Sequence, residues 1–290
     1  MTTVSRWSKA SLLGACGLVG AAWMATITFP SAPSALALAS ERLYTRWFPP
    51  PPPPPQLPDV SARERAAWTE LGSQISGRIV WSSNRDGNHD LFLVDLTSGA
   101  EHRLTDNPHV DFFARFSPDG KSISFLRSQE PWVSFRDESA WDLYLINADG
   151  GGERRLVTGA YHPTWLPNGS GLVYVFENRI YQFDLVSGQT EVLHDGRDAP
   201  TEGRVHEPEL LGDGLIAITL RDVRQETVGV LDQQAGVFHP LSSQRACQIT
   251  WFPGLRRAVW IDPRGNGGTQ VMMADLDDGI ERTLIDLPGP

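Results

Sequence analysis

The densest group of titratable side chains in this sequence is the run His206-Glu207-Pro208-Glu209. An imidazole beside two carboxylates could bind a metal ion or move protons in acid–base catalysis. The same run also fits a strand that places polar side chains at the mouth of a channel. The sequence favours this second interpretation, because the other histidines are scattered and form no HExxH or HxH pair.

A second candidate is the turn Asn84-Arg85-Asp86-Gly87-Asn88-His89-Asp90. Its oxygen-bearing side chains Asp86, Asn88 and Asp90 alternate as in half of a calcium-binding loop, but the distal glutamate of an EF-hand is missing. Hairpin turns are also rich in Asp, Asn and Gly. The sequence therefore favours a structural turn, with calcium as the alternative, and predicts no other cofactor.

Composition excludes several classes of function. The chain has 25 basic and 35 acidic residues, a formal net charge of -10, and no run of Lys or Arg that could follow a phosphate backbone. We therefore expect no nucleic-acid partner. The two cysteines, Cys16 and Cys247, cannot build a disulfide framework, and no CxxC or CxxCH motif is present for zinc or covalent haem.

Five repeated units follow one another from Gly77 onward. The first reads GRIVWSSNRDGNHDLFLVDLTSGAEHRLT: an apolar strand, a polar turn, a second strand ending in an acid, a Gly-containing turn and a short third strand. The acid or amide that ends the second strand recurs at spacings of 52, 37, 48 and 43 residues, at Asp95, Asn147, Asp184, Asp232 and Asp275. This period is typical of β-propeller blades.

A fourth strand with a tight turn precedes four of the five units: ARFSPDGK, PTWLPNGS, PELLGDGL and ITWFPGLR. Pro and Asp/Asn-Gly suit hairpins whose central residues need positive φ. The first unit has no such strand. The sequence therefore predicts an all-β propeller domain over residues 77–290, with about five four-stranded blades, of which the first lacks its innermost strand.

The stretches FSPDGKSISF and SNRDGNHDLFLVD and the ending RLT resemble the TolB-type propeller repeat, strongly to Phe125, moderately to Leu193 and weakly after Glu202. In that family each blade begins with the SPDG strand, next to the central channel. Related propellers precede the hydrolase domain of prolyl-oligopeptidase-like enzymes, which carries a GxSxG motif. This chain has neither that motif nor the length for that domain, so we expect no catalytic residues and no enzyme.

The N-terminal segment, residues 1–40, is expected to target the chain to a membrane. Residues 10–30 carry no charge and are long enough to span a bilayer. An uncleaved signal anchor fits this length, and small residues at a four-residue spacing would let another helix approach closely: Gly17, Ala21 and Ala25. The alternatives are a signal peptide cleaved after Ala37-Leu38-Ala39, and a lipoprotein signal ending in Leu13-Gly14-Ala15-Cys16.

A proline-rich linker over residues 41–60 follows. Its seven consecutive prolines, Pro49–Pro55, favour polyproline II and predict a stiff stalk of about 22 Å. A ligand for a proline-recognising module is the alternative. Trp47 and Phe48, just before the prolines, are candidates for contact with a partner or the lipid headgroups. Residues 61–76 are expected to contain a short helix, which could cap or plug the gap in the first blade.

The second unit carries an insertion, Gln129–Ala140, where a standard blade has only a few polar residues. Long loops on a rigid scaffold often carry binding residues, and Trp, Phe and Arg are favoured interface anchors. Trp132, Phe135 and Arg136 are therefore candidate partner-binding residues. The alternative is that the aromatic side chains pack back onto their own blade.

Two functional hypotheses follow. The first is a non-catalytic scaffold subunit, anchored in the inner membrane with its N-terminus inside and its propeller in the periplasm, which binds other membrane or periplasmic proteins. The second is a propeller that binds a small molecule, glycan or metal ion in its central channel, with or without catalysis.

Overall fold

The computed structural model describes residues 60–134, 137–222, 225–242, 244–252, 256–263, 269–275 and 278–287. The chain divides into two compact units. The larger unit contains every described residue within 60–132 and 138–287. Within 133–137, which belong to the other unit, Asp137 N donates to Ser134 O at 2.9 Å. The expected membrane segment with its packing residues, and the linker aromatics Trp47 and Phe48, lie outside the described residues.

Among the residues that the structure describes, no helix is long and apolar enough to cross a membrane. One helix is described, α3 (Val60–Gly72), in the segment where a short helix is expected.

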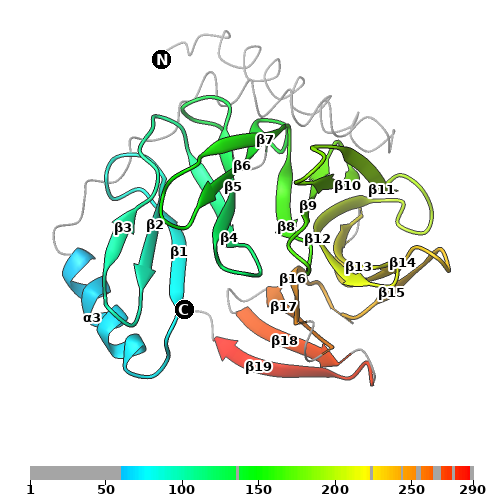
Figure 1. Ribbon diagram of the computed structural model, residues 1–290. Coiled ribbons are helices and arrows are strands. Elements are labelled where there is room, and N and C mark those ends of the chain that lie inside the picture. The colour runs from blue at the N-terminus through cyan, green and yellow to red at the C-terminus, as the bar shows by residue number, and fades with distance from the viewer. Residues whose placement is uncertain are drawn as a thin grey trace, which may run out of the picture. The chain divides into compact units, whose positions relative to one another are not determined.

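The larger unit is a propeller of five antiparallel sheets, as the repeats predict (Figure 1). Blade 1 has three strands, and blades 2 to 5 have four. Blade 1 contains β1 (Arg78–Ser83), β2 (Asp90–Asp95) and β3 (Glu101–Arg103). Blade 2 contains β4 (Asp111–Phe116), β5 (Ser122–Ser128), β6 (Trp141–Asn147) and β7 (Arg154–Thr158). Blade 3 contains β8 (Tyr161–Trp165), β9 (Gly171–Phe176), β10 (Arg179–Asp184) and β11 (Thr190–Asp195).

Blade 4 contains β12 (Arg204–Gly212), β13 (Leu215–Arg221), β14 (Glu226–Asp232) and β15 (Val237–Pro240). Blade 5 contains β16 (Cys247–Phe252), β17 (Arg257–Pro263), β18 (Thr269–Asp275) and β19 (Glu281–Leu287). In each four-stranded blade the strands pair in chain order, so the first strand of the repeat is the first of the sheet. The predicted absence of this strand from blade 1 is confirmed.

The tight turns form because glycine takes the left-handed conformation that the hairpin needs. In blade 2, Gly120 has φ 69° and Ser117 N donates to Ser122 O at 2.8 Å, which joins β4 to β5. The Gly169 turn of blade 3 repeats this arrangement, with φ 72° and a bond of 3.0 Å from Leu166 N to Gly171 O.

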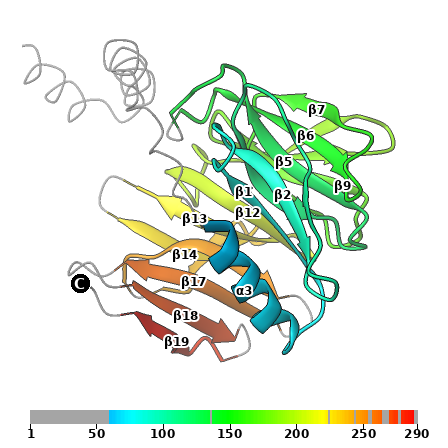
Figure 2. The same cartoon turned by 90° about the vertical axis from the view of Figure 1, so that its left-hand side faces the viewer.

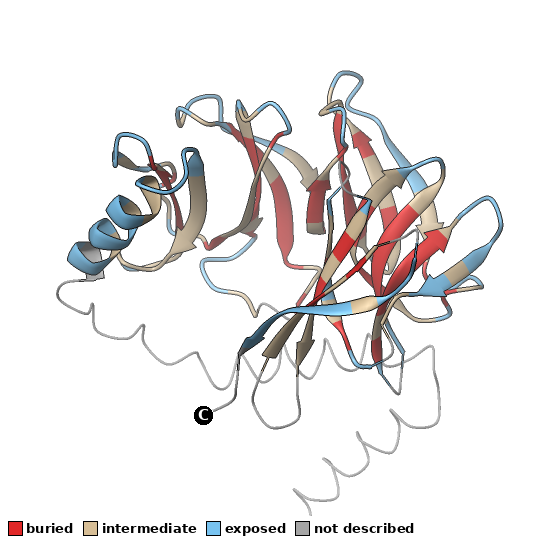
Figure 3. Ribbon diagram, turned by 90° about the horizontal axis from the view of Figure 1, so that it is seen from below, coloured by how far each residue is buried: buried red, intermediate tan, exposed pale blue. Residues whose placement is uncertain are grey.

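The core lies between neighbouring blades, where the apolar faces of the middle strands meet. Buried residues gather along these strands (Figure 3). Leu91 and Leu93 of blade 1 pack with Ile123 and Phe125 of blade 2. The clusters between blades 3 and 4 and between blades 4 and 5 are built in the same way, around Ile216 and Trp260 respectively. This shared packing holds the innermost strands in place around the axis.

Helix α3 packs against blade 1. The Trp68 and Trp81 rings lie 5.3 Å apart, Glu64 forms an ion pair with Arg85 at 2.8 Å, and Figure 2 shows the helix beside β1 and β2. Val80 turns toward blade 2, so its neighbour Trp81 points to the opposite face of the sheet. The helix therefore covers the face of blade 1 that is turned away from blade 2, and not the edge of β1.

Candidate binding site in the central channel

The innermost strands of blades 2 to 5 share one irregularity. Each has a register shift against its neighbouring strand, between Phe112 and Arg115 in β4 and at the matching places in β8, β12 and β16. Inside each shift one residue other than glycine has positive φ: Phe113 (53°), His162 (48°), Glu207 (53°) and Gln248 (58°). Such strained bulges re-aim a side chain and are typical of functional sites.

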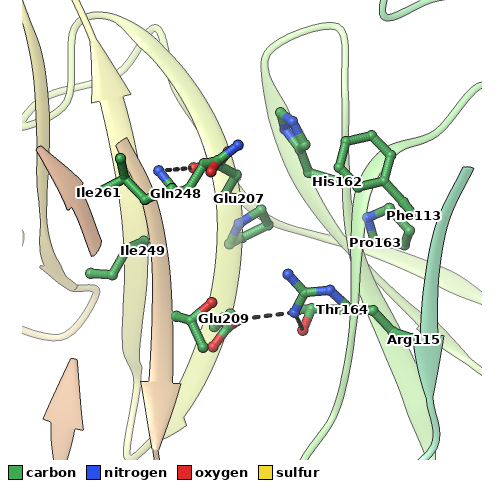
Figure 4. Close-up of a pocket in the computed structure, with 12 residues that line it drawn as sticks. Phe113, Arg115, His162, Pro163, Thr164, Glu207, Glu209, Gln248, Ile249 and Ile261 are labelled. Carbon is green, nitrogen blue, oxygen red and sulfur yellow. Dashed lines mark hydrogen bonds and ion pairs between the residues drawn. The ribbon is translucent and has the colours of Figure 1, made fainter. Parts of the chain in front are cut away.

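These four residues occupy equivalent places, four positions before the first residue of the tight turn in their blade. All four line one cavity of about 300 Å³, together with the residues two positions further along: Arg115, Thr164, Glu209 and Thr250. The channel thus has two rings of side chains, one from the bulges and one just beyond them. Figure 4 shows Phe113, His162 and Arg115 on one side of the cavity, facing Glu207, Glu209 and Gln248 on the other.

The second ring holds an ion pair across the channel. Arg115 Nη1 of blade 2 donates to Glu209 Oε1 of blade 4 at 2.8 Å and to Thr164 Oγ1 of blade 3 at 3.2 Å. Glu209 Oε2 accepts from Trp251 N of blade 5 at 2.6 Å. One carboxylate and one guanidinium therefore join all four complete blades.

Glu207, in the bulge ring, is held by its own blade and by blade 5. Its Oε2 accepts from Thr219 Oγ1 at 2.7 Å and from Gln248 N at 2.7 Å. Burial raises the pKa of Glu207, and these two hydrogen bonds oppose the shift. This carboxylate is fixed in place and bonded within the protein.

Two histidines next to the cavity have nitrogen atoms without partners. The rings of His162 and His206 lie 5.5 Å apart, and both His162 Nδ1 and His206 Nε2 are buried and unbonded. Burial lowers the pKa of His206 to about 3 and that of His162 well below its usual value. Both imidazoles are therefore neutral at pH 7.

The insertion of blade 2 reaches the innermost strand of blade 4. Glu138 accepts a hydrogen bond from Arg204 Nη2 at 2.8 Å, and Glu138 Oε1 lies 3.7 Å from His206 Nδ1. Glu138, near the end of the insertion, thus lies beside His206. On the same loop Trp132 leaves 42% of its surface exposed, whereas Phe135 and Arg136 lie outside the described residues.

The residues of the calcium alternative are engaged within blade 1 and with the connection from blade 1 to blade 2. Asp90 is fully buried and accepts from Arg103 Nη2 at 2.6 Å. Asn88 directs its amide nitrogen to Asn107 O and His109 O, both at 2.5 Å, and Asp86 lies 3.8 Å from Arg103. Across the described part of the chain no group of three or more His, Cys, Asp or Glu side chains is arranged to hold a metal ion.

Two rings of side chains line the cavity, and its polar groups come from four blades. The sequence pointed to one part of this site, the His206–Glu209 run, which lies in the innermost strand β12 as expected. It missed Phe113, Arg115, His162 and Gln248. Counting back four positions from the first residue of each tight turn finds Phe113, His162 and Gln248. Arg115 then follows two positions after Phe113.

No family model matches the chain. It is 27% identical over 128 residues to the uncharacterized protein Atu1656 of Agrobacterium fabrum, a match that covers 38% of this chain and 40% of the relative. The chain thus spans less than half of the length of that relative.

Solved structures share the fold. TolB from Acinetobacter baumannii has a TM-score of 0.55 at 18% identity, over 73% of this chain and 51% of that one. A putative TolB from Agrobacterium tumefaciens has a TM-score of 0.54 at 20% identity, over 74% and 82%. An oligogalacturonate lyase in complex with manganese has a TM-score of 0.52 at 15% identity, over 76% and 64%. The chain therefore has a TolB-like propeller fold, which both enzymes and TolB proteins share.

Proposed function

We propose that this protein is a non-catalytic propeller that binds another protein at the mouth of its channel, as an accessory subunit of a membrane or envelope complex. One observation carries the proposal: the three charged side chains of the channel rings are already bonded within the protein. Arg115 pairs with Glu209, and Glu207 accepts two hydrogen bonds. Groups held in this way shape a rigid surface, and both carboxylates among the described lining residues are engaged within the protein.

The insertion supplies the contact surface. Its Glu138 is held at β12 by Arg204, and its Trp132 is 42% exposed. A partly exposed tryptophan on a loop fixed to a rigid scaffold is a favoured anchor for a protein partner. In this proposal the apolar segment at 10–30 tethers the chain to the inner membrane, the stalk spaces the propeller from it, and the propeller is periplasmic.

Site-specific photocrosslinking in living cells tests this function. A photoreactive amino acid replaces Trp132 in the full-length chain, and the matched control places it at Val237, which is 41% exposed on the outer strand of blade 4. We expect one discrete protein adduct from position 132 and none from position 237. Equal or absent adducts at both positions would contradict partner binding at the insertion.

A second candidate function rests on the unbonded nitrogens of His162 and His206 beside a cavity of about 300 Å³. Neutral imidazoles are suitable metal or hydrogen-bonding ligands. Titration of the purified full-length protein with Mn²⁺, followed by calorimetry, tests it. Stoichiometric binding that is lost in His162→Ala and kept in His102→Ala would favour this second function.

A further inference from the structure

The inner edge of blade 1 is an open β-strand edge. Blades 2 to 5 each begin with an innermost strand. In blade 1 the sheet begins with β1, which among the described residues pairs only with β2. Figure 1 shows β1 as the strand of its blade nearest the centre of the ring. The edge of β1 therefore occupies the place that another strand fills in every other blade.

The hydrogen-bonding pattern shows which backbone groups are open. Leu96 N donates to Gly77 O at 2.9 Å, and in an antiparallel ladder bonded pairs alternate with non-bonded ones. The amides and carbonyls of Arg78, Val80 and Ser82 therefore point away from β2. In blades 2 and 3 the residues equivalent to Arg78 are Ser122 and Gly171, whose carbonyls accept from the innermost strand.

Within its described residues this edge carries few of the usual protections. The β1–β2 register runs unbroken from Arg78 to Ser83, and the strand RIVWSS contains no proline, lysine or bulge. Exposed edges are normally blocked by such features, because an open edge pairs with any extended chain that reaches it. The edge is six residues long, which suffices for one strand.

The described segment that leads into β1 packs on a face of blade 1 and not on the edge of β1. Helix α3 ends at Gly72, five residues before Gly77, and it packs on the face of blade 1 through Trp68. The proline run at 49–55 cannot form a ladder, since proline has no amide hydrogen.

We propose that an extended segment of a partner protein adds to β1 as the missing innermost strand and completes blade 1. This inference rests on the proposed function and names the form that the partner takes. The innermost strands of blades 2 to 5 indicate which residues the added segment would have. The segment would place a small apolar residue against the blade-1 core, as Ala114 does from β4, and a polar residue toward the channel, as Arg115 and Glu209 do.

Hydrogen–deuterium exchange on the full-length protein in detergent tests this proposal. In the isolated protein we expect the amides of Arg78, Val80 and Ser82 to exchange quickly, while those of Ile79, Trp81 and Ser83 are protected by β2. The probe is a synthetic peptide of residues 109–120, the innermost strand of blade 2. At about 1 mM, the weak end of specific binding, it should slow exchange of the three open amides about tenfold or more.

Backbone methylation of the probe gives a matched control. Ser117 N donates to β5 in the intact protein, so the neighbouring amide of Phe116 points the other way. A peptide with an N-methyl group at the Ser117 position should fail to protect β1, and one methylated at the Phe116 position should still protect it. Equal behaviour of the two peptides would overturn strand addition.

A protein variant supplies an independent control. Ser82→Pro removes one open amide and keeps the β1–β2 ladder, while Ser82→Ala loses the same hydroxyl bond to Asp111 O but keeps the amide. The peptide should bind Ser82→Ala and not Ser82→Pro.

Two outcomes overturn the proposal: no protection by the peptide, or protection of all six amides in the isolated chain, which would mean that a segment of the chain itself fills the edge. A Trp132 adduct without protection of β1 would leave the proposed function standing and remove only this inference.

Discussion

Replacing Gln248 with glycine should stabilise the propeller. Gln248 has φ 58°, its side chain is exposed, and its backbone amide donates to Glu207 Oε2. Glycine keeps that amide and removes the Cβ that makes the left-handed conformation unfavourable. Because no buried contact is lost, the substitution isolates the backbone strain of the channel bulge.

The magnitude follows from two opposing terms. A residue other than glycine in the left-handed region costs about 1–2 kcal/mol, and glycine loses about 0.5–1 kcal/mol more conformational freedom on folding. The net gain is therefore about 0.75 kcal/mol. For a domain of this size that corresponds to a rise in Tm of about 1.5–3 °C.

Differential scanning fluorimetry of the full-length protein measures this shift. The matched control is Gln182→Gly, at a residue of β10 whose φ is not positive, where glycine should lower the stability by about 0.5–1 kcal/mol. Opposite signs for the two variants would support strain at the bulges. If Gln248→Gly destabilises the protein as much as Gln182→Gly does, the strain argument is wrong.

Two further predictions concern buried ionisable groups. Asp111 is fully buried and accepts two hydrogen bonds from Arg127. Asp111→Ala should lower the free energy of unfolding, measured by chemical denaturation, by about 3 kcal/mol, the lower end for a broken buried pair, because Glu153 still pairs with Arg127. The control Lys121→Ala, at an exposed ion pair, should lower it by less than about 0.5 kcal/mol. Burial lowers the pKa of His206 to about 3, so as the pH falls the unfolded chain takes up this proton at a higher pH than the folded protein does. The free energy of unfolding should therefore fall as the pH drops from about 6.5 toward 3. His206→Gln should flatten this slope, and an unchanged slope would contradict the lowered pKa of His206.

The blades could be predicted from the sequence because their signals are local. Alternating apolar residues and Gly-containing turns recur within each unit, and the missing SPDG-type strand showed where blade 1 is incomplete. Local patterns also placed the His206–Glu209 run on a channel strand.

The channel itself could not be predicted, because its contacts join residues far apart in the sequence. Arg115 and Glu209 meet across the axis, although 94 positions separate them. The positive φ at His162 could not be predicted either, because a positive φ is expected at glycine and not at histidine. Only the closure of four blades around one axis brings these residues together.

We propose that the propeller works as a partner-binding subunit. Native mass spectrometry of the full-length protein, extracted from its own membranes in mild detergent, tests it most directly. We expect a complex of defined stoichiometry with at least one other protein, which is weakened by Trp132→Ala and unchanged by Val237→Ala. A single chain with no bound protein, in the original and in both variants, would contradict the account.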